Sequence, residues 1–238
     1  MTITWGKFYG VGVGPGDPRF LTLRAVEVLQ AVNIVAIPKS RLDRESVAWE
    51  IAQKHCHQNV KLLELEMPMT SDREILQKAW QDGAQAILKE IQAGHSVAFI
   101  TLGDASLYST YSYLLDNLRP TLPEDQIETV PGITAMSAAA ARVNIPLAVG
   151  DEPLLVLPSS EDVDNYLSFP NLVLMKVSRQ LPQLLKVLTE SGRASVLLTR
   201  LGQANEEIRR QPKLSDIKDE KIDYLSLLLV KGKPEGVQ

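Results

Sequence analysis

The alternation of apolar, strand-like runs with helix-like segments constrains the fold of the first half of the chain more than any other feature. Short apolar runs typical of buried strands span residues 8–13, 34–37, 61–66, 96–101 and 127–130. Helical spacing of apolar residues predicts helices over 22–32, 44–55, 72–94 and 106–118. Strands that alternate with helices form parallel sheets through right-handed crossovers. We therefore expect a mainly parallel α/β domain.

The second half has a different pattern. Its strand candidates are 154–157, 172–177, 195–199 and 225–230, and its helix candidates are 134–143, 160–167 and 180–190. Residues 203–222 are polar and weakly patterned, so a hairpin, a loop or a short helix is expected there. Pro120, Pro123 and the acidic pair after them are typical of a boundary. We predict an N-terminal α/β domain over 1–120 and a C-terminal mixed α+β domain over 121–238.

Composition excludes several classes of partner. The 238 residues include 25 basic and 29 acidic side chains, a net charge of −4 that argues against a general nucleic-acid binder. No apolar run approaches the ~20 residues that span a bilayer, and the first residues lack the order of a secretion signal. One cysteine, Cys56, excludes an intrachain disulfide. We expect a cytoplasmic protein without a nucleic-acid or membrane partner.

A glycine-rich loop over residues 10–18 follows the first predicted strand, where nucleotide-binding loops are found. It does not match the dinucleotide pattern G-x-G-x-x-G. The position of the third glycine is occupied by Pro15 when the pattern begins at Gly10, and by Asp17 when it begins at Gly12. The phosphate-loop Gly-Lys-Ser/Thr is absent, and Asp17-Pro18 disfavours a phosphate at the following helix. The loop either lets a ligand other than a phosphate approach the backbone or is a tight turn without a ligand.

Two further loops follow predicted strands at the same edge of the sheet. Residues 101–110 contain Gly103 and Asp104, and residues 130–135 contain Thr134. Ligands of open parallel sheets bind at the carboxyl ends of the strands. Asp104 is suited to hold an ammonium group or a ribose hydroxyl, and the alternative is a helix N-cap formed by Asp104 or Ser106. Thr134 is suited to cap the next helix or to contact a ligand.

Together these loops resemble the tetrapyrrole methylase superfamily of S-adenosylmethionine-dependent methyltransferases. The matching segments are Gly12 to Pro18, 102–104 with 108–110, and 130–134, followed in the second half by 150–152, 174–177 and 226–230. The later segments, with Tyr111-Ser112-Tyr113, look most like the precorrin-2 C20-methyltransferase branch, which acts in cobalamin biosynthesis. The resemblance extends over nearly the whole chain.

The resemblance implies two α/β domains with S-adenosylmethionine in the cleft between them, a tetrapyrrole in an open trough, and a homodimer. It implies that the cofactor is bound by Pro15, Leu102, Gly103, Asp104, Leu107, Thr134, Ala135, Met175, Leu201, Gly202, Ser226 and Leu227. Ala105 departs from the proline that many members have after the Gly-Asp pair. That difference leaves the shape of the second loop open.

The substrate of such an enzyme carries many carboxylates, so an acidic chain must present basic residues locally. The candidates are Lys39, Arg41 and Lys176, with Tyr108 or Tyr111 facing the ring; for each, a surface or core role is the alternative. No metal site is expected, because the histidines at 55, 57 and 95 do not form a ligand set. No catalytic base is identified.

Three functions remain at this point. The first is methylation of precorrin-2, or of its cobalt-bearing form, at C20. The second is a different regiochemistry, such as uroporphyrinogen III methylation. The third is a non-catalytic binder of a tetrapyrrole or nucleotide with the same fold.

Overall fold

The computed structural model describes residues 4–39, 46–158, 162–217 and 221–232. The chain forms two compact units, Met1–Thr134 and Ala135–Gln238. The predicted boundary after residue 120 is therefore too early. The Pro120–Asp125 segment is a turn inside the first unit, because the strand that follows it, β5 (Ile127–Val130), pairs with the first strand of the chain.

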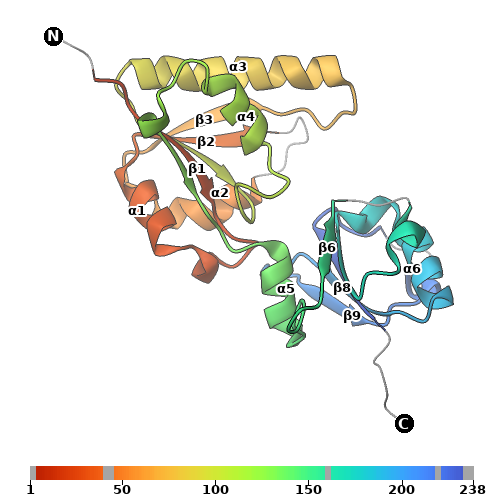
Figure 1. Cartoon of the computed structure of the whole chain (residues 1–238). Coiled ribbons are helices and arrows are strands. Elements are labelled where there is room, and N and C mark those ends of the chain that lie inside the picture. Colours follow the sequence, from red (N-terminus) through yellow and green to blue (C-terminus); the bar gives the residue numbers. More distant parts are fainter. Residues whose placement is uncertain (1–3, 40–45, 159–161, 218–220, 233–238) are drawn as a thin grey trace. The chain divides into compact units, whose positions relative to one another are not determined.

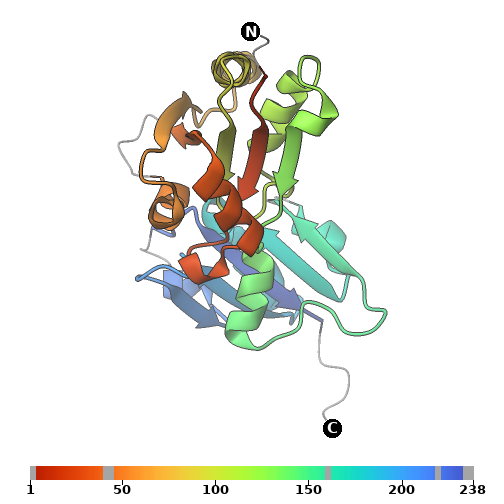
Figure 2. The ribbon, with the colours of Figure 1, turned by 90° about the vertical axis from the view of Figure 1, so that its left-hand side faces the viewer.

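The first unit contains the predicted parallel sheet. Its strands are β1 (Phe8–Gly12), β2 (Ile34–Lys39), β3 (Lys61–Glu66), β4 (Val97–Thr101) and β5. They pair in the order β3-β2-β4-β1-β5, and each pair is parallel. Figure 2 shows β1 between its two neighbours, β4 and β5. The carboxyl ends of β4, β1 and β5 are therefore adjacent.

Helices cover both faces of this sheet (Figure 1). α1 (Leu23–Ala31) and α2 (Val47–Ala52) pack on one face, and α3 (Arg73–Gln92) and α4 (Tyr111–Leu118) pack on the other. The hydroxyl of Thr22 accepts a hydrogen bond from Ala25 N at 3.1 Å, and Asp72 accepts one from Glu74 N at 2.9 Å. Thr22 and Asp72 are therefore the N-caps of α1 and α3.

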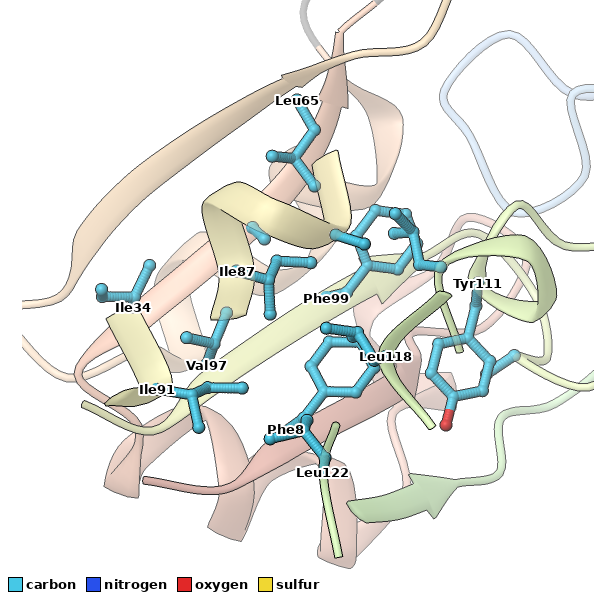
Figure 3. Packing of buried hydrophobic residues seen from close by; sticks show 14 of the residues in the cluster. Phe8, Ile34, Leu65, Ile87, Ile91, Val97, Phe99, Tyr111, Leu118 and Leu122 are labelled. Atoms are coloured by element: carbon cyan, nitrogen blue, oxygen red, sulfur yellow. The ribbon is translucent and has the colours of Figure 1, made fainter. Parts of the chain in front are cut away.

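The α3 and α4 face encloses the larger aromatic side chains (Figure 3). Phe8 and Phe99 of the sheet are fully buried, together with Ile87 and Ile91 of α3. Helical spacing over α3 places Ile87 and Ile91 one turn apart on one side of the helix, which is why this long helix stays against the sheet.

The second unit begins with α5 (Ala135–Val143) and contains a mixed sheet in the order β6-β7-β10-β8-β9. Its strands are β6 (Leu154–Leu157), β7 (Asn171–Met175), β8 (Ala194–Thr199), β9 (Glu207–Arg210) and β10 (Ser226–Lys231). β6 is parallel to β7, and the other three pairs are antiparallel. α5 packs on one face and α6 (Leu181–Glu190) on the other, which confirms the mixed α+β prediction.

Two predicted helices differ from the structure. The helix expected at 106–118 begins only at Tyr111, because side chains of residues 104 and 109 hydrogen-bond to the backbone and hold a loop before it. Within 160–167, the described residues form a single 3-10 turn, Val163–Tyr166. The polar 203–222 segment contains β9, which pairs with β8. The remaining 3-10 turns are Pro18–Phe20, Gln53–His55, Glu124–Gln126, Val177–Arg179 and Leu214–Ile217.

Helices in the described part of the chain lack the combination of length and hydropathy that a bilayer-spanning helix requires.

Candidate functional site

The glycine loop and the loop after β4 are joined by backbone hydrogen bonds. Gly14 N donates to Gly103 O at 3.1 Å, and Gly103 N donates to Gly14 O at 2.7 Å. Both residues have positive φ, 78° and 76°, which glycine adopts without a steric penalty. The two loops thus form an antiparallel bridge just beyond the ends of the parallel strands β1 and β4.

The loop after β5 approaches this bridge so closely that only glycine fits. A Cβ atom at Gly12 would lie 2.7 Å from Gly103 O and 2.7 Å from Gly132 N. A Cβ atom at Gly132 would lie 2.2 Å from Gly103 O. All three loops therefore meet at Gly12, Gly103 and Gly132, and we refer to these residues with Gly14 and Asp104 as the loop junction.

A hydrogen bond to the Asp104 side chain connects the third loop to the second. That side chain is only 8% exposed. Oδ2 accepts a hydrogen bond from Gly132 N at 2.7 Å, and Oδ1 accepts from Ser106 N at 2.8 Å and from the Ser106 hydroxyl. An ionised carboxylate has about four acceptor positions. Described residues occupy three of them, which leaves about one for a further hydrogen-bond donor. The helix-cap alternative for Asp104 is wrong, because α4 begins at Tyr111.

The other predicted residues of the first unit surround the junction. Pro15 is buried, and Leu102, Leu107 and Thr134 are half-buried. Arg19 hydrogen-bonds Asp17 through its side chain and so holds the pKa of that carboxyl below its ordinary value. Asp17 thus stays charged and accepts a hydrogen bond from Arg19 N at 2.9 Å. That backbone donor is not available to a phosphate.

In the second unit, predicted residues meet where β7 and β8 end and β10 begins. Met175 of β7 pairs with Leu227, and Ser226 pairs with Thr199 at the end of β8. Leu201 is buried in the same apolar cluster as Leu227, with Met175 against it. This edge brings together strand ends that are more than twenty residues apart in the sequence.

Gly202 and Ser226 of this group differ in how their polar groups are bonded. Gly202 has a φ of 76°, and its N–H donates to Glu206 Oε2 at 2.8 Å. The hydroxyl of Ser226 is buried and has no hydrogen-bond partner among the described residues. The residue as a whole is 5% exposed, and its N–H donates to Tyr224 O at 2.9 Å. Ala135 is the first residue of α5.

The predicted substrate residues are placed in different surroundings. Lys39 ends β2, and its Nζ lies 2.5 Å from Glu64 Oε2, beside a cavity of about 400 Å³ that Lys78 and Asp82 also line. Lys176 follows β7 with a φ of 56°, and its Nζ lies 5.9 Å from the ring centroid of Tyr224. Arg41 lies outside the described residues.

The two tyrosines of the second loop differ from each other. Tyr111 is 2% exposed, its hydroxyl lies 2.6 Å from Thr129 Oγ1, and its ring stacks on Phe8 at 5.8 Å between centroids (Figure 3). The expectation that Tyr111 faces a substrate is corrected, because it is a core residue. Tyr108 is 43% exposed and precedes α4, although the helix expected over 106–118 would have included it.

Sequence reasoning missed the contribution of Gly132 and Ser106 to the junction. The Pro131-Gly132 pair was recognised only as part of a motif, and nothing in the spacing predicts that Asp104 bonds to a residue 28 positions later.

Cys56 lies between two of the three histidines in the sequence, and burial raises the pKa of its thiol to about 11. In the described part of the chain, no three His, Cys, Asp or Glu residues gather in a metal-binding arrangement.

Comparison with known proteins places these observations in a family. A family model described as Tetrapyrrole (Corrin/Porphyrin) Methylases matches residues 7–217. The solved structure of a cobalt precorrin-4 methyltransferase has the same fold, with a TM-score of 0.71 at 20% identity over 94% of each chain.

Curated relatives are similar over nearly their whole length. A probable cobalt-precorrin-2 C(20)-methyltransferase of Methanocaldococcus jannaschii is 39% identical over 94% of this chain and 96% of its own. A cobalt-precorrin-2 C(20)-methyltransferase of Salmonella typhimurium is 32% identical, with the same coverage. A precorrin-2 C(20)-methyltransferase of Sinorhizobium is 30% identical over 95% and 96%. Because the family model spans most of the chain and these relatives match it throughout, this chain belongs to the tetrapyrrole (corrin/porphyrin) methylase family, as the resemblance predicted.

Proposed function

We propose that this chain is a methyltransferase that moves a methyl group from S-adenosylmethionine to C20 of precorrin-2 or cobalt-precorrin-2 in cobalamin biosynthesis. Relatives with these names match it at 30% identity or more over nearly their whole length. The observation that carries the proposal is the loop junction, in which three loops are locked together by Gly12, Gly103, Gly132 and the buried Asp104.

The residues of the junction fit the methyl donor. The glycines leave the backbone open to close approach, and Asp104 keeps one acceptor position for an ammonium or ribose hydroxyl. The donor supplies a methyl group on a positively charged sulfur. Leu102 and Leu107 place apolar side chains in the same loop as Asp104. We propose that they exclude water, which would otherwise stabilise the charged sulfur before transfer.

The remaining cofactor residues are proposed from the family resemblance and their placement. In the first unit these are Pro15, Gly103 and Thr134. In the second unit they are Ala135, Met175, Leu201, Gly202, Ser226 and Leu227, of which four gather at the edge where β10 begins. We propose that these residues hold the donor so that its sulfur, its methyl group and the acceptor carbon lie in line. Such orientation can by itself accelerate the methyl transfer.

Lys39 and Lys176 are proposed to meet carboxylates of the tetrapyrrole. Lys39 is paired with Glu64 at the surface, where an ion pair is worth little, so a substrate carboxylate can compete for it. A homodimer in the cytoplasm is part of the same proposal, on the family resemblance.

A binding and turnover experiment tests this function. S-adenosylhomocysteine should bind with a micromolar dissociation constant in a calorimetric titration. Incubation with precorrin-2, or with cobalt-precorrin-2, and S-adenosylmethionine should yield a tetrapyrrole heavier than the substrate by one methyl group in the mass spectrum. Binding without turnover on either substrate would reject the C20 function but keep the methyl-donor site. Absence of binding would reject both and leave a non-catalytic role.

A further inference from the structure

The loop after β8 is held by the carboxylate of its last residue. Residues 200–206 connect β8 to β9 and include Leu201 and Gly202. Glu206 closes this loop, and its side chain is 14% exposed. Its Oε2 accepts a hydrogen bond from Gly202 N at 2.8 Å, and its Oε1 accepts one from Arg142 Nε at 2.5 Å. One carboxylate is therefore bonded both to the loop and to α5.

The bond to Gly202 fixes a residue type that has unusual backbone freedom. Gly202 has a φ of 76°, and glycine has more accessible backbone conformations than any other residue. A hydrogen bond to its N–H selects one of these conformations. Because Glu206 occupies the N–H, the polar group that Gly202 can offer to a ligand is its carbonyl oxygen, an acceptor. The bond thus determines how the loop presents that acceptor.

The second bond joins the loop to α5. Arg142 lies in the last turn of this helix, which begins at the predicted methyl-donor residue Ala135. Leu201 is buried in the same apolar cluster as Val143 of α5. The Arg142 side chain is 58% exposed, so its ion pair with Glu206 contributes little by itself. The hydrogen bond from Gly202 N is therefore expected to be the more important of the two.

We infer that Glu206 is a positioning residue for the methyl donor, because its carboxylate holds Gly202 in the conformation that meets the ligand. The inference rests on the proposed function, in which Leu201 and Gly202 contact the donor. Asp104 is its counterpart in the first unit, since that carboxylate also accepts a hydrogen bond from a glycine N–H. A loop that is ordered in advance loses less free energy on binding, so removal of the carboxylate should weaken donor binding.

Three variants and two controls test the inference. Glu206→Ala removes both acceptors, Glu206→Gln keeps an oxygen for Gly202 N, and Arg142→Met keeps the carboxylate without its second partner. Glu190→Ala is the surface control, because this glutamate is 65% exposed on α6. Arg193→Lys is the destabilised control: it removes backbone contacts of a buried side chain that precedes β8, at the end of the strand opposite to the loop.

The measurements separate the two substrates and the stability. For each variant, the urea midpoint, the dissociation constant of S-adenosylhomocysteine, and the KM values for S-adenosylmethionine and precorrin-2 are determined. Glu206→Ala should raise the dissociation constant and the KM for S-adenosylmethionine at least about tenfold, and leave the KM for precorrin-2 within about twofold. Glu206→Gln and Arg142→Met should each raise the dissociation constant less than about threefold, because the bond from Gly202 N is kept. Arg193→Lys should lower the urea midpoint but change the dissociation constant less than about twofold, and Glu190→Ala should change neither.

A purely structural role of Glu206 predicts other results. The inference is overturned if Glu206→Ala binds S-adenosylhomocysteine as tightly as the wild type, or if Glu206→Gln binds it as weakly as Glu206→Ala. It is also overturned if Arg193→Lys weakens binding as much as Glu206→Ala, because the loss then reflects stability alone. If Glu206→Ala does not fold, Glu206→Asp takes its place with the same expected result, since its carboxylate is one methylene shorter. A wild-type chain that binds no S-adenosylhomocysteine rejects the proposed function together with this inference, whereas the other outcomes leave the proposed function standing.

Discussion

Asp104 shows how one side chain can determine the geometry of a site. Its two oxygens receive donors from the second loop and from Gly132 of the third loop, and none of these donors is a charged side chain. A buried carboxylate that accepts hydrogen bonds from two backbone N–H groups and a hydroxyl is fixed in direction. The family motif predicted that Asp104 binds the cofactor. The hydrogen bonds show that it connects two loops, a role that the motif did not predict.

The variant Asp104→Asn should break this connection. An amide has one acceptor oxygen, so its NH₂ group must face either Gly132 N–H or the Ser106 donors, and a buried donor is left unpaired. We expect a loss of about 1–3 kcal/mol of unfolding free energy and a fall in S-adenosylhomocysteine affinity of at least about tenfold. Urea unfolding and calorimetric titration measure the two effects.

The matched control is Asp116→Asn, the same change on the exposed face of α4. It should alter neither quantity by more than the error of the measurement. If Asp104→Asn binds S-adenosylhomocysteine as tightly as the wild type, our assignment of the junction as the methyl-donor site is wrong.

Cys56 gives a prediction about pH. Burial raises the pKa of its thiol to about 11, because the thiolate is less well solvated in the fold. The thiolate fraction at pH 8 is therefore lower in the folded chain than in the unfolded one. Reaction with a chromogenic disulfide at pH 8 should be at least about tenfold slower in buffer than in concentrated urea, and should accelerate as the pH rises toward 10. Equal rates in the two solvents would show that the thiol is not buried.

At the scale of elements, the loop junction follows from the parallel sheet. β4, β1 and β5 are adjacent and run in the same direction, so the loops that follow them begin side by side. This convergence was predictable, because the strands are apolar runs and the connecting segments have helical periodicity. The start of α4 was not predictable. Apolar spacing continues back to residue 106, but hydrogen bonds from Asp104 and Ser109 favour a loop there.

The variant Gly132→Ala tests the closeness of the loops. The added Cβ would lie 2.2 Å from Gly103 O, so the third loop must move away from the second. We expect S-adenosylhomocysteine affinity to fall at least about tenfold, with a loss of about 1–3 kcal/mol of stability. Gly232→Ala is the control, because its nearest contact is an ordinary 3.5 Å. Affinity within twofold of the wild type for Gly132→Ala would contradict the close packing.

At the scale of the whole molecule, each unit has its own sheet with helices on both faces and its own apolar clusters. The two fold classes were predictable from the change in pattern along the sequence. The boundary was not, since the Pro-rich turn before β5 resembles a linker although β5 pairs with β1. Contacts between strands far apart in sequence decide such boundaries, and local composition does not record them.

Arg193 is a buried cation that connects separate segments of the second unit. Arg193 is 8% exposed and donates to the carbonyl oxygens of Leu167, Phe169, Pro170 and Lys231 at 2.7–2.9 Å. The planar guanidinium reaches all four, whereas a lysine ammonium is a single point. Arg193→Lys should therefore lower the unfolding free energy by about 2 kcal/mol in urea titration. The exposed Arg119→Lys should have no effect, and equal stability of both variants would contradict this role for Arg193.

The position of the transferred methyl group tests the central claim most directly. The chain is incubated anaerobically with precorrin-2, and separately with cobalt-precorrin-2, in the presence of S-adenosylmethionine labelled with carbon-13 in its methyl group, and each product is examined by carbon NMR. Our account predicts one new labelled methyl signal bonded to C20, which at limiting S-adenosylmethionine forms more slowly in Asp104→Asn and at the wild-type rate in Asp116→Asn. A label on any other carbon, or an unlabelled tetrapyrrole from both the metal-free and the cobalt-bearing substrate, would contradict it.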